Sequence, residues 1–141
     1  MLTLAIAVCS FCAFAGEDEV NSKVLNAFNT QFNTAKDIQW SVSTDYVRAT
    51  FTYNEKHVFA YYTLNGDFIG LSRYVSLSEL PMNLQASLKK DYSSYWISNL
   101  VEVANNDGTT YYATLENADT KLVLRSTDAR SFTNYQRTRK S

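Results

Sequence analysis

The chain is poor in the residues that build many chemical sites. Its 141 residues include two cysteines, one histidine, one proline and four glycines. Both cysteines, Cys9 and Cys12, fall in a leading segment that we expect to be removed. The remaining domain would then lack a disulfide, a thiol nucleophile and a thiolate metal site. The scarcity of glycine and proline also argues against a low-complexity or disordered chain, so a packed core has to hold the domain together.

Charge and histidine are equally sparse. The formal net charge is −1, which lacks the basic excess of nucleic-acid-binding proteins, so we expect no nucleic-acid partner. His57 follows Glu55 and Lys56 and is expected to flank a turn, with no second histidine at metal-ligand spacing. No Gly-x-Ser-x-Gly elbow and no glycine-rich phosphate loop occur. We therefore predict no metal, no cofactor and no enzymatic activity; a hydrolase whose site the sequence hides is the alternative.

Residues 1–15 have the pattern of a signal peptide. The apolar run from Leu2 to Phe14 is too short to span a bilayer, and Ala13-Phe14-Ala15 supplies a small-x-small cleavage pattern. We place the cut after Ala15, which predicts a periplasmic or secreted domain over 16–141 that does not cross the membrane. No Lys or Arg precedes the apolar run, which leaves open a start upstream of Met1. A buried N-terminal strand or helix is the competing interpretation.

Apolar periodicity predicts two helices and a series of strands. Val20 to Phe32 carries apolar residues at spacings of three and four, typical of an amphipathic helix. A second helix is expected from Ser78, its predicted N-cap, with Leu80, Leu84, Leu88 and Tyr92 as its buried stripe. Strands are predicted at 38–43, 45–53, on both sides of a turn within 57–74, and at 100–104, 110–116, 121–127 and 131–137.

The stretch 57–74 predicts a hairpin with two apolar faces. Asn65-Gly66 is a strong signal for a two-residue type I′ turn. That turn would place Tyr61 opposite Gly70 and Phe59 opposite Ser72, with Phe68 and Tyr74 on the same face as these rings. The other face of the hairpin would pack against the helices.

The element order repeats along the chain. Positions 44–73 can be laid over 108–137 without a gap, which aligns Ala49-Thr50 with Ala113-Thr114. A chance resemblance between amphipathic strand pairs is the alternative to an internal duplication. We favour two tandem repeats, at about 20–75 and 78–137, each of a helix plus antiparallel strands. This predicts an α+β domain with one sheet and two helices on one face of it.

Several short segments resemble a known family. They are AFNTQFNTAKDIQW (27–40), YVRATF (46–51), AYYTLNGDFI (60–69), LPMNLQASLKKDY (80–92) and YYATL (111–115). Together with the leader, they resemble the PepSY-like domains that share the fold of the beta-lactamase inhibitor protein. The resemblance implies a small exported bacterial protein of two helix-plus-sheet repeats. The namesake inhibitor binds its target with a concave sheet and protruding turns, but the chain carries no matching loop motif, so inhibition is an analogy of fold only.

The second face of the sheet is the candidate site. An Arg48 opposite Tyr61 would make a cation–π contact. Three functions compete for this face: cross-strand pairs that stiffen an exposed sheet, a surface that binds a protein or peptide, and a homodimer interface. We predict an exported, non-enzymatic domain that binds a protein or peptide here, with a structural envelope domain or an inhibitor of a periplasmic enzyme as alternatives. The candidate binding residues are Tyr46, Arg48, Phe59, Tyr61, Phe68, Tyr74, Tyr112 and Arg125.

Overall fold

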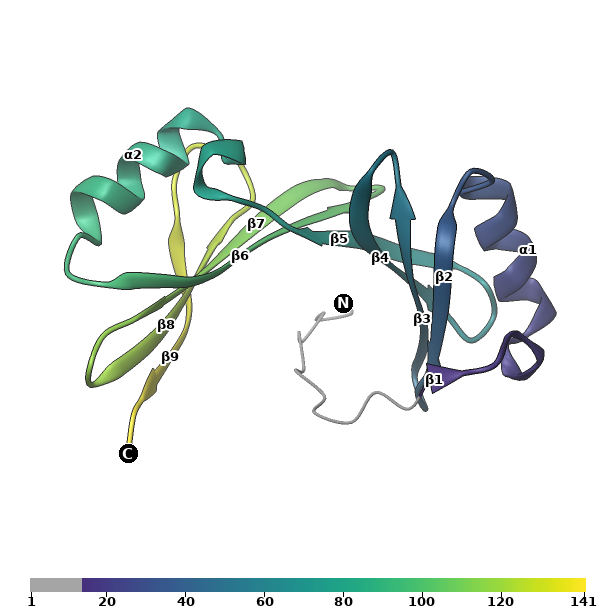
Figure 1. Cartoon of the computed structure of the whole chain (residues 1–141). Coiled ribbons are helices and arrows are strands. Elements are labelled where there is room, and N and C mark those ends of the chain that lie inside the picture. The colour runs from purple at the N-terminus through teal and green to yellow at the C-terminus, as the bar shows by residue number, and fades with distance from the viewer. Residues whose placement is uncertain (1–13) are drawn as a thin grey trace.

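The computed structural model describes residues 14–141, so most of the predicted signal peptide lies outside the described residues. The chain forms one nine-stranded antiparallel sheet in which every strand pairs with its neighbours in sequence (Figure 1). The strands are β1 (Phe14–Ala15), β2 (Lys36–Val42), β3 (Tyr46–Tyr53), β4 (Lys56–Thr63), β5 (Phe68–Tyr74), β6 (Trp96–Asn105), β7 (Gly108–Glu116), β8 (Thr120–Ser126) and β9 (Thr133–Arg139). The helices are η1 (Glu17–Glu19), α1 (Ser22–Gln31), η2 (Leu77–Glu79) and α2 (Met82–Asp91).

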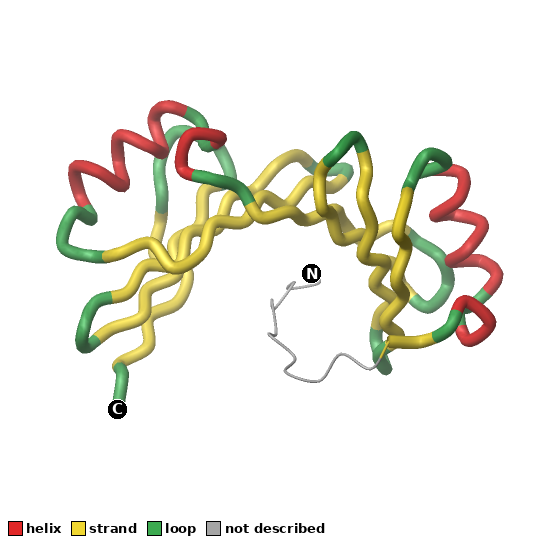
Figure 2. The backbone as a smooth tube through the Cα atoms, viewed as in Figure 1, coloured by secondary structure: helices red, strands yellow, loops and turns green. Residues whose placement is uncertain are grey.

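The sheet is bent into an arch. Both α-helices lie on its outer, convex side, while no described helix covers the inner, concave side (Figure 2). This arrangement confirms the predicted α+β class, with one antiparallel sheet and two helices on one face. The concave side is therefore the second face of the sheet, which the sequence predicts to lie opposite the helices.

Each helix packs on its own half of the sheet and forms its own core. The stripe Val20, Val24, Phe28 and Phe32 is buried against residues of β2, β3 and β4, and the ring of Phe28 meets those of Trp40 and Phe51 edge-on. Leu80, Leu84 and Leu88 are buried against β6, β7 and β8 in a second cluster. Both stripes are as the periodicity predicts, and the two clusters are separate.

The start of the second helix differs from the prediction. Ser76, not Ser78, caps a short 3-10 turn, because its side chain and that of Glu79 form a reciprocal capping box. Pro81 then occupies the N-cap position of α2. Two helices begin in close succession here, η2 after Ser76 and α2 after Pro81. A single capping signal in the sequence does not distinguish these two starts.

The two hairpin turns of the first half differ in length. Asn54 and Glu55 have φ of 49° and 66°, and Tyr53 pairs with Lys56, which makes this the two-residue type I′ turn. The Asn65-Gly66 turn is instead a three-residue loop, in which Thr63 pairs with Asp67 and Gly66 alone takes a positive φ. The predicted type I′ turn at Asn65-Gly66 is therefore wrong.

A β-bulge in β5 restores the predicted register and moves Phe68 to the opposite face of the sheet. Tyr62 pairs with Phe68, whereas Tyr61 pairs with Gly70, so Ile69 is the extra residue. Phe68 consequently faces the helices, where its ring lies 5.7 Å from Tyr62 and 6.5 Å from Phe32. The placement of Phe68 on the open face is thus wrong, while Tyr61 opposite Gly70 and Phe59 opposite Ser72 are confirmed.

The second half repeats the order of the first. Each half begins with a 3-10 turn that leads into an α-helix and then four antiparallel strands. The bulges at the first strand pair also correspond, between Lys36 and Gln39 in β2 and between Ile97 and Asn99 in β6. The strand at the end of this order, β9, is an edge strand.

The two halves meet where β5 pairs with β6 over four residue pairs, Leu71–Ala104 to Tyr74–Val101. On the convex side of this seam, the Arg73 guanidinium donates to both carboxylate oxygens of Glu102, at 3.1 and 3.4 Å. It also donates to Glu79 of η2 at 3.3 Å, which links the seam to the start of the second half. The pKa of Glu79 is lowered, first by the hydrogen bond from the Ser76 backbone amide and then by the one from Arg73.

We expect Gly66→Ala to destabilise the fold by about 2 kcal/mol. A Cβ at this position would lie 2.8 Å from the backbone oxygen of Lys23 in the first turn of α1, at a φ of +90°. Gly108→Ala is the matched control, because it also has a positive φ but nothing lies within 4 Å of the added Cβ. Urea unfolding should show a larger loss of unfolding free energy for Gly66→Ala than for Gly108→Ala. Equal losses would mean that the close contact with the Lys23 backbone does not affect stability.

We expect Glu79→Gln to lower stability at pH 7 and to have a smaller effect at pH 3. A carboxyl whose folded pKa is depressed stabilises the fold above its unfolded pKa, and this contribution is lost as pH falls through the folded value. Urea unfolding at both pH values, with Glu55→Gln in the exposed type I′ turn as control, measures the difference. A deficit that persists unchanged at pH 3 would contradict the assignment.

Candidate functional site

The candidate site is the concave face of the sheet, formed by the strand residues that alternate with the core. Val47, Ala49 and Phe51 of β3 point to the helices, whereas Tyr46, Arg48 and Thr50 point to the concave side. The same alternation holds along the other central strands. Seven of the eight predicted binding residues lie on this face, with Phe68 the exception.

In the first half, rings and a guanidinium form one contact group. Arg48 and Tyr61 face each other across β3 and β4, as predicted. The Arg48 guanidinium, however, lies over the ring of Phe59 at 5.6 Å, so the cation–π partner is Phe59 instead of the predicted Tyr61. The ring of Tyr61 packs against that of Tyr46 in a tilted arrangement, with ring centroids 5.8 Å apart. Each cation–π or ring pair of this kind contributes on the order of 0.5–1 kcal/mol.

Phe59 extends this group toward the seam. Its ring meets that of Tyr74 edge-on at 5.9 Å and lies 6.5 Å from the His57 ring. The described pairing of β4 with β5 extends as far as Phe59 and Ser72. Tyr74 is 64 % exposed, so one face of this ring remains accessible to a partner.

The second half carries a similar group that contains one residue the sequence analysis missed. The Arg125 guanidinium lies 4.9 Å above the ring of Tyr135 in β9, and Tyr135 packs edge-on against Tyr112 at 5.5 Å. Burial raises the pKa of Tyr112, with the neighbouring Tyr135 adding to the shift and Arg125 opposing it. Tyr135 sits at a bulge between Val123 and Leu124 of the partner strand, which a simple alternation of faces does not reveal.

The two groups are continuous across the seam. Tyr74 pairs with Val101, and Val101 pairs with Tyr112, which in turn pairs with Arg125. Val101 and Val103 belong to neither helix-side core, yet both are less than 10 % exposed beneath the concave face. The centre of the face therefore has a packed apolar floor, with aromatic rings and arginines on both sides of it.

The far end of the face holds the C-terminus in place. Lys140 forms an ion pair with Glu116 at 3.2 Å, donates to the carbonyl of Asn117 and lies over the exposed ring of Trp96 at 4.8 Å. The pKa of Glu116 is lowered by a hydrogen bond from Ser98 and then by Lys140. These contacts hold the residue that follows β9 against the edge of the sheet.

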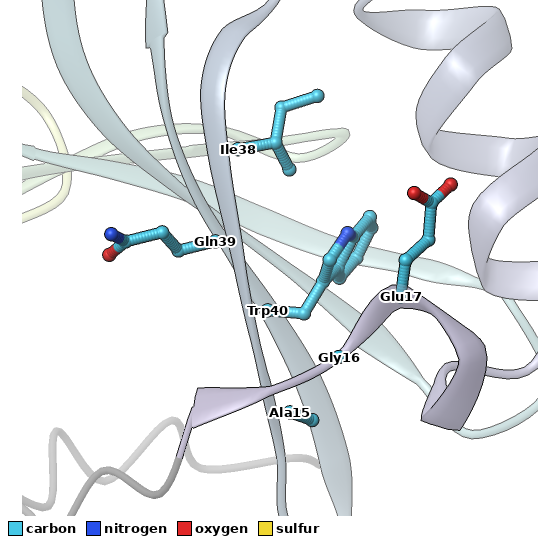
Figure 3. Close-up of a pocket in the computed structure, with 6 residues that line it drawn as sticks. All are labelled: Ala15, Gly16, Glu17, Ile38, Gln39 and Trp40. Carbon is cyan, nitrogen blue, oxygen red and sulfur yellow. The ribbon is translucent and has the colours of Figure 1, made fainter.

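A shallow pocket lies away from this face, beside the first edge of the sheet. Its volume is about 440 Å³, and it is lined by Ala15, Gly16, Glu17, Ile38, Gln39 and Trp40 (Figure 3). Glu17 and Trp40 lie on one side of β2, while Gln39 points to the other. Among the described residues of this lining, Glu17 is the one titratable side chain, so these residues do not pair a nucleophile with a base.

The described residues offer neither a metal cluster nor a membrane-spanning helix. Over residues 14–141, no three His, Cys, Asp or Glu side chains gather in a way that could hold a metal ion. Within the same range, neither α-helix has the length and hydropathy needed to cross a bilayer.

Comparisons of sequence identify no relative. No known family model matches the chain. No curated protein matches it either.

Solved structures, by contrast, match most of the chain. A BLIP-like protein from Bacteroides fragilis is 15% identical, with a TM-score of 0.72 over 85% of this chain and 86% of that one. A DUF2874 family protein from Bacteroides ovatus is 18% identical, with a TM-score of 0.74 over 85% and 87%. A Bacteroides eggerthii protein, described as a candidate periplasmic protein, is 17% identical, with a TM-score of 0.71 over 85% and 88%. The chain therefore has the fold of the BLIP-like and DUF2874 proteins, as the resemblance to PepSY-like domains predicts.

Proposed function

We propose that this chain is an exported, non-enzymatic domain that binds a protein or peptide through the concave face of its sheet. The observation that carries the proposal is the row of aromatic and arginine side chains that runs across both halves on the face without helices. Tyrosine and arginine are enriched at the energetic centres of protein interfaces. A concave surface also lets one ligand contact both halves at once.

The position of the cores supports binding over a purely structural role for this face. The buried clusters that each helix covers already supply the large apolar burial of each half. The concave rings are only partly buried, and Tyr74 is exposed over most of its surface. An exposed aromatic row that the core does not need is well suited to a partner.

Export and the absence of catalysis belong to the same proposal. The apolar leader with its Ala13-Phe14-Ala15 pattern favours secretion or the periplasm, and the Bacteroides eggerthii protein of the same fold is described in similar terms. The concave residues are rings, arginines and small polar groups, a composition suited to recognition. Inhibition of a periplasmic enzyme is a narrower form of this function, resting on the fold alone.

The test is a capture experiment with variants of the concave face. Arg48→Ala combined with Tyr61→Ala, and separately Tyr74→Ala, should lose partners that the unmodified domain retains from a periplasmic extract. Binding of a purified captured partner should weaken about tenfold or more for the double variant, as expected when interface anchors are truncated. Tyr74→Ala truncates a side chain that is 64 % exposed, so we expect it to disturb the packing less than the double variant does.

The matched control places two substitutions on the convex side, Asn29→Ala in α1 and Lys89→Ala in α2, both at exposed positions. It should retain every partner. If the concave variants and this control capture the same proteins, the proposal is wrong. If sedimentation instead shows that the concave variants only dissolve a dimer, the face is an interface between copies of the chain.

A further inference from the structure

Strands β2 and β9, near the two ends of the sheet, differ in how well they resist the addition of a further strand. The edge strand β9 carries Arg137 and Arg139, both exposed, and Lys140 follows it. Charged side chains on an edge strand hinder its pairing with another chain. The second half of β2, residues 39–42, carries no charged side chain. This part of β2 is therefore suited to receive a strand along its outer edge.

Strand β1 occupies this edge in the chain that retains its leader (Figure 1). Its two residues pair antiparallel with β2, Phe14 with Ser41 and Ala15 with Trp40. Both residues precede the expected cut after Ala15, so export removes β1 and exposes the edge of β2. Neither buried cluster includes a residue before Val20, so the cut leaves the residues of both cores in the exported chain.

The side chains along this edge are apolar on the helix side of the sheet. Trp40 is buried there, and Ile38 and Val42, which alternate with it along β2, are 39 % and 42 % exposed. The pocket of about 440 Å³ lies beside Trp40 and is lined in part by Ala15 and Gly16, so this side of the edge is open (Figure 3). The pairing of Ala15 with Trp40 shows that a small residue fits at this position.

We propose, building on the export in the function above, that the exported chain binds an extended peptide segment as an added strand along β2. The segment takes the place of β1 and runs antiparallel to residues 39–42. It carries a small residue opposite Trp40 and an apolar residue opposite Val42, with polar residues between them. Main-chain hydrogen bonds supply the affinity of such an added strand, and the alternate side chains supply its specificity.

The N-terminus of the exported protein is the first test. The full chain is expressed in a bacterial host, and the protein recovered outside the cytoplasm is analysed by mass spectrometry. We expect a chain that begins at Gly16. A chain that keeps Phe14 and Ala15 would retain β1 at the edge of the sheet and would overturn the proposal.

Fluorescence anisotropy with a labelled synthetic peptide tests the strand addition itself. The probe has the sequence Val-Thr-Ala-Thr-Val, which can place alanine opposite Trp40 and valine opposite Val42. Its control has the same side chains but carries N-methyl groups on the alanine and on the following threonine, which removes an N–H donor that faces β2. The exported chain should bind the probe about tenfold more tightly than the control. A chain that begins at Phe14 should bind the probe about tenfold more weakly, because β1 fills the site.

A charge on the edge of β2 should block the added strand. Val42→Lys places an ammonium where the valine of the probe would lie, and it should weaken binding of the probe about tenfold. Leu64→Lys is the matched control, because Leu64 lies in the loop between β4 and β5 and is 43 % exposed, against 42 % for Val42. This control should leave binding unchanged. Equal binding of the probe and its N-methyl control, or equal affinities of the two lysine variants, would overturn the proposal.

Two further outcomes separate this site from the concave face and from self-association. If Tyr74→Ala loses the probe and Val42→Lys keeps it, the peptide binds the concave rings and the edge site is wrong. If sedimentation shows that the exported chain dimerises and that Val42→Lys dissolves the dimer, a second copy replaces the peptide as the added strand. Failure of the edge site leaves the capture result for the concave variants unchanged, so the two proposals fail separately.

Discussion

Four residue pairs between β5 and β6 hold the two halves of this sheet together. Each half has its own helix and its own buried cluster, and the clusters do not merge. The seam therefore depends on backbone pairing, on Arg73 with its two carboxylates on the convex side, and on the small apolar floor on the concave side. Because a part-buried guanidinium with two carboxylate partners is costly to leave unpaired, this contact favours one geometry of the junction.

That junction makes the concave face a single surface. Tyr74 belongs to the last strand of the first half, and it pairs with Val101 in the first long strand of the second. The ring and guanidinium contacts of the two halves then join through Tyr112. A ligand that spans the arch would contact residues from both halves, so the curvature of the sheet at the seam governs how well these residues converge.

The sequence predicted most of this architecture, because the two periodicities are strong. The helix stripes through Phe28 and Leu84 and the alternation of β3 follow directly from burial. The predictions are wrong where one extra residue in a turn or strand moves a side chain to the opposite face of the sheet. The three-residue turn at Leu64-Asn65-Gly66 and the bulge at Ile69 compensate each other, so the register survives at Tyr61 while Phe68 turns inward. A bulge also lies at Tyr135 in β9, which is why the sequence did not place this ring on the concave face. The pattern of apolar residues predicts neither bulge.

The alternation of the strands assigns stability and surface chemistry to different residues. Helix-facing positions such as Val47 and Ala113 fill the clusters, while their neighbours Arg48 and Tyr112 contact neither helix-side cluster. Substitutions on the inner surface can therefore accumulate without any repacking beneath the helices. The solved structures of this fold share only 15–18% of their residues with this chain, at TM-scores of 0.71–0.74. An arch built in this way can change its inner surface in evolution while its scaffold stays the same.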